Sequence, residues 1–326
     1  MSEARLGFWV LLFACVIPAP SAECAQPSWY PTKPIRVIVP FSPGGGTDFI
    51  ARLVGIKLTE KWGQAVIIDN RPGAGSVLGT NLVANSAPDG YTIGIVSTEH
   101  TVMPSLQKQL PYNPVTDFSP ISQNVRQSYI VAIHPDVKAT SMQELMSVIK
   151  ARNGGFVWGA AHGSVGHLAG EMLKQRAGLQ MIFVPYKGTG PALIDLLGGQ
   201  ISLTFSNPLA VMPHIKANRL RALAITSTSR SAIAPELPTV AEATSLPGFE
   251  ASGWNGFLAP RAVPAHIVAE LNNAIVSVLG LPDVRERIAR DGSELVASKP
   301  AEFAAHIHQE VGKWAKVVRE AGMKFE

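Results

Sequence analysis

Hydrophobic residues along this chain form short continuous runs, separated by longer segments in which apolar positions recur with helical spacing. Continuous rather than alternating apolarity predicts strands that are buried on both faces. Strands that alternate with helices predict an α/β fold with mainly parallel sheets and helices on both faces. The first two helices are expected over residues 47–62 and 76–84. The predicted strands are residues 35–41, 65–69, 91–96, 129–134, 156–160, 181–185, 201–205 and 220–226.

The pattern changes toward the C-terminus. Residues 254–259 predict one more strand. After it, helical spacing dominates, and little strand signal separates the segments. The predicted C-terminal helices are residues 264–280, 282–290 and 300–321.

The length of the chain predicts two domains. About 300 residues remain after the N-terminal segment, enough for two domains of roughly 150 residues each. We place the crossovers near residues 129–134 and near the segment FEASGW. Domain 1 is then discontinuous and comprises residues 27–131 and 253–326, and domain 2 comprises residues 132–252.

The N-terminal segment, residues 1–25, predicts a secretory signal peptide. Arg5 precedes the apolar run Leu6–Ile17, and small, turn-forming residues follow it. About twelve helical residues reach about 18 Å, short of the roughly 30 Å hydrocarbon core, which disfavours a spanning anchor. The two cysteines, Cys15 and Cys24, lie within this segment. The folded part is therefore expected to have no internal disulfide.

The charge of the chain excludes one class of partner. The formal net charge is +4, and the basic residues are scattered among acidic ones. A nucleic-acid-binding surface usually gathers lysines and arginines on one face, so we expect no nucleic-acid partner. The mild positive excess suits an anionic ligand.

The loops that follow the predicted strands form the candidate site. In open parallel sheets, ligands bind beyond the carboxyl ends of the strands. These loops share glycines, small hydroxyl residues and helix starts. Glycine permits close approach, and free N–H groups at a helix start favour an anion. The loops are residues 42–48, 97–101, 161–167, 186–190 and 206–208.

Nucleotide binding is a weaker interpretation of the glycines. The segment PGGGTD at 43–48 has the composition of a tight turn as well as of a phosphate loop. The segment GAGSVLG at 73–79 misses the dinucleotide pattern, because Leu78 stands where its third glycine belongs. No Gly-Lys-Ser/Thr phosphate loop occurs in the chain.

Catalysis is a second alternative. Ser164 lies between His162 and His167, and a serine beside an imidazole is a possible nucleophile with its base. The esterase elbow, however, needs glycine at position 162, and Ser164 is also a good helix N-cap. The histidine and cysteine spacings predict no metal site. Among the histidines, we expect ligand contacts from His100 and His167, because they lie in the crevice loops.

Several long segments, in order, resemble the tripartite tricarboxylate transporter substrate-binding receptors, also called Bug proteins. The resemblance extends from about Tyr30 to the C-terminus. Long motifs in the right order are more specific than any single glycine loop. The segments that carry it are YPTKPIRVIVPFSPGGGTDFIARL, NRPGAGSVLGTNLVANSAPDGYT, VPYKGTGPALIDLLGGQISLTFSN and HIKANRLRALAITSTSRSAIAPELPTVAEA.

The resemblance implies a periplasmic binding protein of the two-domain type II fold, with a ligand cleft between the domains. It implies delivery of a small organic carboxylate to a membrane permease, without catalysis, cofactor or metal. In the family, backbone N–H groups, small polar side chains and bridging waters hold the carboxylate. The implied ligand-binding residues here are Ser42, Pro43, Gly44, Gly45, Thr47, Asp48, Ser97, Thr98, His100, His162, Gly163, Ser164, His167, Ser206 and Asn207.

The chain departs from the family pattern at positions that distinguish ligands. Glu99 and Met103 stand in a segment that often resembles Thr-His-Ala-x-Asn-Pro, and His162 and Val165 replace small or polar residues. A carboxylate at Glu99 would repel an anion unless it points away or the ligand carries a donor. The identity of the carboxylate therefore does not transfer from the family.

Two alternative functions stay open from the sequence. One is a secreted α/β hydrolase that uses Ser164 and His167. The other is a binding protein that feeds a sensor instead of a permease. Turnover of model esters would distinguish the first from a receptor, because a receptor has no turnover to lose when Ser164 is replaced.

Overall fold

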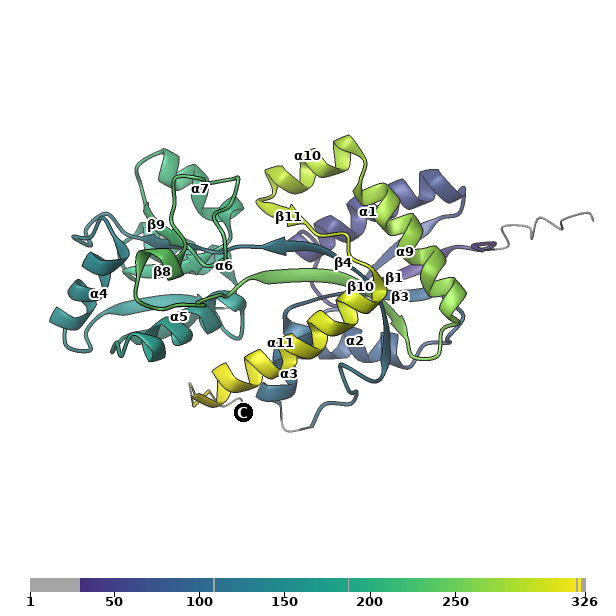
Figure 1. Ribbon diagram of the computed structural model, residues 1–326, viewed down its shortest axis with the longest axis horizontal. Coiled ribbons are helices and arrows are strands. Elements are labelled where there is room, and N and C mark those ends of the chain that lie inside the picture. The colour runs from purple at the N-terminus through teal and green to yellow at the C-terminus, as the bar shows by residue number, and fades with distance from the viewer. Residues whose placement is uncertain (1–29, 108, 187, 321, 324–326) are drawn as a thin grey trace, which may run out of the picture.

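The computed structural model describes residues 30–107, 109–186, 188–320 and 322–323. The predicted signal peptide and both cysteines lie outside the described residues. The described chain forms two lobes, each built on one sheet, and two long strands run side by side from one lobe toward the other (Figure 1).

Sheet A, in the first lobe, has the strand order β11-β4-β10-β3-β1-β2. Helices cover both of its faces. Along β1, Val37 and Val39 pack in one hydrophobic core and Ile38 packs in another, because successive side chains of a strand point to opposite faces. The strands are β1 (Ile35–Val39), β2 (Val66–Asn70), β3 (Thr92–Ser97), β4 (Phe118–Gln127), β10 (Gly253–Pro260) and β11 (Ser293–Leu295).

Sheet B, in the second lobe, has the order β7-β6-β8-β5-β9. It too is buried on both faces, since Ile130 and Ala132 pack in one core and Val131 and Ile133 in another. Its strands are β5 (Ile130–Ile133), β6 (Val157–Ala161), β7 (Ile182–Tyr186), β8 (Leu203–Ser206) and β9 (Arg221–Ile225).

The helices match the predicted segments closely. The helix predicted over 47–62 is α1 (Gly46–Trp62), and a 3₁₀ turn (Ala74–Ser76) leads into α2 (Val77–Ala84). The others are α3 (Glu99–Leu106), α4 (Met142–Ala151), α5 (Val165–Arg176), α6 (Thr189–Leu197), α7 (Pro208–Lys216), α8 (Val240–Ala243), α9 (Ala265–Leu279), α10 (Pro282–Arg290) and α11 (Pro300–Glu320).

The α/β class with two helix-covered sheets is confirmed, but the sheets are mixed instead of mainly parallel. Strand β1 is parallel to β2 and β3, and β6 is parallel to β7 and β8. Strand β10 is antiparallel to β3 and β4, β11 is antiparallel to β4, and β5 is antiparallel to β8 and β9. The reason is the return crossing, since β10 enters sheet A from the other lobe and inserts between β3 and β4.

The chain changes sheets twice. It leaves sheet A after Gln127 at the end of β4, enters sheet B at Ile130, and returns before Gly253. The domain boundaries proposed from the sequence stay a prediction. Strands β4 and β11 were not predicted, because β4 carries polar residues such as Gln123 and Asn124 and β11 is short.

The glycines of the segment 73–79 allow the backbone of neighbouring elements to pack closely. A Cβ at Gly79 would lie 2.6 Å from the Arg71 carbonyl oxygen and 2.7 Å from Pro40. Glycine therefore lets α2 approach the end of β1 closely. Gly75 has a φ of +63°, a left-handed conformation that favours glycine.

In the described part of the chain, no single helix has the length and apolarity needed to cross a membrane. The helices α9 and α10 pass that test only as a pair, and they are bent by 75° at their junction.

Candidate ligand cleft between the two sheets

A cavity of about 610 Å³ lies where the two sheets meet. Loops of both lobes and the crossing strands β4 and β10 form its wall. This volume is within the range of small-molecule sites. The lining residues are Phe41, Ser42, Pro43, Gly44, Gly45, Gly46, Thr47, Ser97, Thr98, Glu99, Val125, Gln127, Tyr129, Ala161, Ser164, Val165, Gly188, Thr189, Asn207, Gly253, Trp254, Asn255, Asp291 and Ser293.

Five helices begin at this cavity, and each of their N-cap residues lines it. The N-caps belong to α1, α3, α5, α6 and α7, and they are Gly45, Thr98, Ser164, Gly188 and Asn207. The first N–H groups of a helix have no partner within it, and the helix dipole adds partial positive charge there. The convergence of helix N-termini therefore favours an anionic group in the cavity.

The first loop, residues 42–48, keeps its backbone open toward the cavity. A Cβ added at Gly44, Gly45 or Gly46 would meet no atom within 4 Å, so these glycines are not needed for packing. Gly44 has a φ of +89°, which favours glycine for steric reasons. The loop therefore exposes its backbone to the cavity and leaves open the space that larger side chains would fill.

Asp48 holds this loop in place from behind. Its carboxylate accepts hydrogen bonds from Gly44 N at 2.8 Å, Arg52 Nε at 2.9 Å and Asn70 Nδ2 at 2.8 Å. Burial by itself would raise the pKa of Asp48, but these bonds outweigh it and hold the pKa below its usual value. Asp48 is buried and does not line the cavity, so the structure gives it a positioning role.

The side-chain charges of the lining are acidic. Among the described residues of this lining, none is Lys, Arg or His, whereas Glu99 and Asp291 carry carboxyl groups. The Ser97 hydroxyl donates to Glu99 Oε2. Burial raises the pKa of Asp291, although a hydrogen bond from Ser293 at 3.0 Å opposes this. Within the described part of the lining, the helix N-termini and the backbone are therefore the sources of positive potential.

Most of the residues expected from the sequence meet at this cavity. The structure brings Ser42, Pro43, Gly44, Gly45, Thr47, Ser97, Thr98, Ser164 and Asn207 into its lining. The expected residues outside the lining are Asp48, His100, His162, Gly163, His167 and Ser206. Of these, Ser206 lines an adjoining pocket of about 20 Å³, room for about one water molecule.

His100 is a core residue in this structure. Its side chain is 1% exposed, its Nε2 lies 2.9 Å from the Pro114 carbonyl oxygen, and its ring lies against Tyr112 and Phe118. Burial lowers the pKa of His100 to about 4, although the bond to Pro114 opposes this. Helix α3 turns its side chain away from the cavity, which spacing along the sequence did not reveal.

His167 supports the loop after β6. The Gly163 N–H donates to its Nδ1 at 3.1 Å, and its ring stacks on Phe183 with centroids 3.9 Å apart. Burial, with smaller contributions from His162 and Lys174, lowers the pKa of His167 to about 3. The His167 ring is therefore neutral, and its Nδ1 already accepts a hydrogen bond from the backbone of the loop.

Ser164 is the N-cap of α5. Its hydroxyl donates to the Ala161 carbonyl oxygen at 2.7 Å and accepts from His167 N at 3.3 Å. The hydrolase hypothesis requires the serine hydroxyl to donate to an imidazole nitrogen. In this structure the His167 Nδ1 has the Gly163 N–H as its partner, and the Ser164 proton goes to a carbonyl group.

The sequence analysis missed several residues that line the cavity. Gln127 and Tyr129 come from the outgoing crossing strands, Trp254 and Asn255 from the returning strand, and Asp291 precedes β11. The first four were missed because the prediction took site residues from the loops that follow the strands and from no other segment. A rule that the segments joining two domains also line the cleft between them would have found them.

Among residues 30–107, 109–186 and 188–320, no three His, Cys, Asp or Glu side chains converge as a metal site requires. The two lobes, the cavity between them and the convergent helix N-termini define a class of protein, namely a two-lobed receptor for a small ligand.

The model of one family, described as the tripartite tricarboxylate transporter family receptor, matches residues 50–323. This chain therefore belongs to that family, and the resemblance seen in its sequence is confirmed. It is 39% identical over 300 residues to Protein BugT of Bordetella pertussis, a match that covers 91% of this chain and 92% of BugT.

Solved structures agree in fold over nearly the whole described chain. R. palustris Rpa4515 with adipate is 34% identical, with a TM-score of 0.81, and the match covers 91% of this chain and 100% of that one. MatC from Rhodopseudomonas palustris with bound malate is 31% identical, with a TM-score of 0.77, covering 89% and 100%. The family is one of transporter receptors. A third similar structure is that of the periplasmic binding protein BugD, which is 33% identical, with a TM-score of 0.78, covering 91% of this chain and 100% of that one.

Proposed function

We propose that this protein is a periplasmic receptor that captures a small organic carboxylate in the cleft between its sheets and delivers it to a tripartite-type permease. It performs no catalysis and uses no cofactor. The hydroxyl and backbone groups of the crevice loops hold the carboxylate, and the signal peptide predicted over residues 1–25 directs the chain out of the cytoplasm.

The observation that carries this proposal is the convergence of helix N-termini. Five N-cap residues line one cavity, and none of the described lining residues is Lys, Arg or His. Backbone N–H groups and the neutral polar side chains of the described lining are therefore the donors that meet an anion. The adipate and malate bound to two similar structures support a carboxylate as that anion.

Hydrogen bonds of this kind are sufficient for useful affinity. A hydrogen bond to a charged group contributes about 1.5 to 3 kcal/mol, and micromolar affinity requires about 8 kcal/mol net. Four or five such bonds would reach this value after the costs of ordering the ligand. Closure of the lobes would exclude water and strengthen the bonds, and would give the permease a shape to recognise.

A thermal-shift screen tests the proposal. The mature protein is unfolded and refolded to remove carried ligand, then mixed with mono-, di- and tricarboxylates, amino acids and the matching amides. Ligand at 100 times its dissociation constant should raise the melting temperature by about 5 to 10 °C. A shift with an acid but not with its amide supports the proposal. Equal shifts, or no shift with any acid, contradict it.

A further inference from the structure

Glu99 is a carboxylate in the cleft that no cation among the described residues pairs with. It is the first residue of α3, it is partly exposed, and it lines the cavity. Its Oε2 accepts one hydrogen bond from the Ser97 hydroxyl. A carboxylate has about four acceptor positions, and no other described residue donates a hydrogen bond or an ion pair to this one.

Among the described residues that line the cavity with Glu99, none is Lys, Arg or His. The other carboxyl group of this lining, Asp291, likewise has a hydroxyl group, that of Ser293, as its side-chain partner. The α3 N-terminus favours negative charge in its first turn, but it supplies no side-chain donor. A ligand in the cavity therefore meets the N-termini of α1, α5, α6 and α7, and at the N-terminus of α3 it also meets the Glu99 carboxylate.

These two features select different parts of one ligand. The helix N-termini suit a carboxylate group, whereas Glu99 suits an N–H donor that carries positive charge. A second carboxylate beside Glu99 would meet like charge in a site of low dielectric constant, where such repulsion is strong. The cleft is therefore complementary to a zwitterion, because it offers helix N-termini to a carboxylate group and the Glu99 carboxylate to an ammonium group.

We infer that Glu99 selects zwitterionic aminocarboxylates over dicarboxylates of the same length, by binding the ligand ammonium while the helix N-termini bind the ligand carboxylate. This inference rests on the proposed function, because it assumes that a carboxylate occupies the cleft. Glu99 is then a specificity-determining residue of that site.

Isothermal titration of matched ligands tests the inference. The series has three to six carbons, and each length includes the dicarboxylate, the ω-amino acid, the α-amino acid and the plain monocarboxylate. The wild type should bind at least one amino acid about 30-fold or more tightly than the dicarboxylate of the same length. Glu99→Gln keeps an acceptor for Ser97 but removes the charge, so this preference should fall about tenfold or more.

Glu286→Gln is the matched control. It also removes one negative charge, but Glu286 lies exposed on α10 and pairs with Arg290, outside the cavity lining. The ligand preference of this variant should equal that of the wild type. Thermal unfolding without ligand should show that both variants fold.

The outcomes separate this inference from the proposed function. A dicarboxylate that binds best, with an unchanged preference in Glu99→Gln, overturns the role of Glu99 and leaves a carboxylate receptor in place. An amino acid preference that survives in Glu99→Gln also overturns it. No binding of any acid by either form contradicts the proposed function itself, and the inference with it.

Discussion

Two carboxylates, Glu99 and Glu310, lie near Trp254 but have different sets of partners. Glu310 is buried on α11, and its Oε2 accepts hydrogen bonds from both Trp254 Nε1 at 3.2 Å and Trp314 Nε1 at 2.8 Å. Its Oε1 lies 2.5 Å from Lys313 Nζ. Glu99, in the cavity, has the Ser97 hydroxyl alone as a donor among the described side chains. A satisfied carboxylate stabilises the fold, and an unsatisfied one is available to a ligand.

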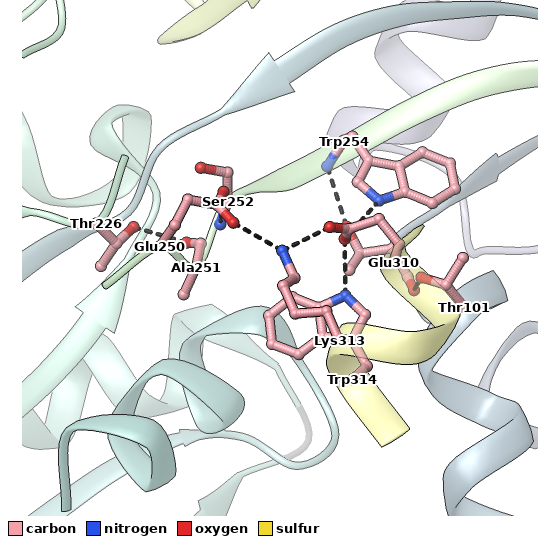
Figure 2. A network of polar contacts seen from close by, with 10 residues as sticks. Thr101, Thr226, Glu250, Ala251, Ser252, Trp254, Glu310, Lys313 and Trp314 are labelled. Carbon is pink, nitrogen blue, oxygen red and sulfur yellow. Dashed lines mark hydrogen bonds and ion pairs between the residues drawn. The ribbon is translucent and has the colours of Figure 1, made fainter. Parts of the chain in front are cut away.

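The polar network of Glu250, Trp254, Glu310, Lys313 and Trp314 also connects the crossing segment to α11. Figure 2 shows Lys313 between Glu250 and Glu310, with Lys313 Nζ 2.7 Å from Glu250 Oε2. Glu250 precedes β10, the strand that returns to sheet A. Burial would raise the pKa of Glu250, but the charge and hydrogen bond of Lys313 outweigh it and lower the pKa. The backbone N–H of Trp254 donates to Thr98 Oγ1 at 3.0 Å, which links this network to the cavity.

The largest expected effect is on stability, and it tests whether Glu310 stabilises the fold. Glu310→Ala leaves two buried indole N–H groups without their acceptor and removes one of the two carboxylates that pair with Lys313. We expect the free energy of unfolding to fall by about 3 kcal/mol, measured by urea denaturation. Glu320→Ala, which removes an exposed carboxylate of the same helix, should change it by less than about 0.5 kcal/mol. Equal effects of the two variants would contradict the structural role of Glu310.

A second prediction concerns His100, a buried group whose pKa is lowered to about 4 by burial. In the unfolded chain histidine titrates near 6.5. Between pH 6.5 and 4 the unfolded state therefore binds the extra proton, and stability falls as the pH falls, by about 1.4 kcal/mol per pH unit.

His100→Gln removes this titration. Its free energy of unfolding should fall by about 2 to 3 kcal/mol less than that of the wild type between pH 6.5 and 4.5. Urea unfolding at several pH values measures this, and each protein at pH 7.5 serves as its own reference. Parallel pH profiles would show that His100 is protonated in the folded protein.

A third prediction addresses the empty space of the cavity. Gly45 is in extended conformation and an added Cβ would meet no atom within 4 Å. Gly45→Val should therefore keep the unliganded fold, yet its side chain would occupy space beside the proposed anion site. We expect ligand affinity to fall tenfold or more, about 1.4 kcal/mol, by isothermal titration.

Gly312→Ala is the matched control for Gly45→Val. Gly312 is exposed within α11, and nothing lies within 4 Å of its added Cβ. This variant should stabilise the protein by about 0.5 to 1 kcal/mol, since alanine favours a helix over glycine, and should leave ligand affinity unchanged. Equal affinities of the wild type and Gly45→Val would show that the ligand lies elsewhere in the cavity.

The smallest effect is expected for Ser164→Ala. Loss of the N-cap of α5 should cost about 1 kcal/mol of stability by urea denaturation. Neither the variant nor the wild type should hydrolyse model esters, because the Ser164 hydroxyl donates to a carbonyl group instead of an imidazole. Hydrolysis by the wild type that the substitution removes would restore the hydrolase hypothesis.

Local sequence signals predicted the elements and the loops well. The apolar runs became strands of both sheets, and α1 begins one residue before its predicted start at Thr47. Ser164 and Asn207 accept hydrogen bonds as N-caps. These features depend on neighbours within a few residues, so the chain itself carries the information.

The sequence by itself therefore determined the α/β alternation, the glycine loops at the strand ends, and the unusual acid at Glu99. The tertiary structure alone decided that the sheets are mixed, that His100 packs in the core, and that Trp254 and Asp291 reach the cleft. It also decided that Glu310 finds its donors and Glu99 does not. The physical reason is that the strand order and the partners of a buried polar group depend on contacts between segments far apart in the chain, which no local pattern encodes.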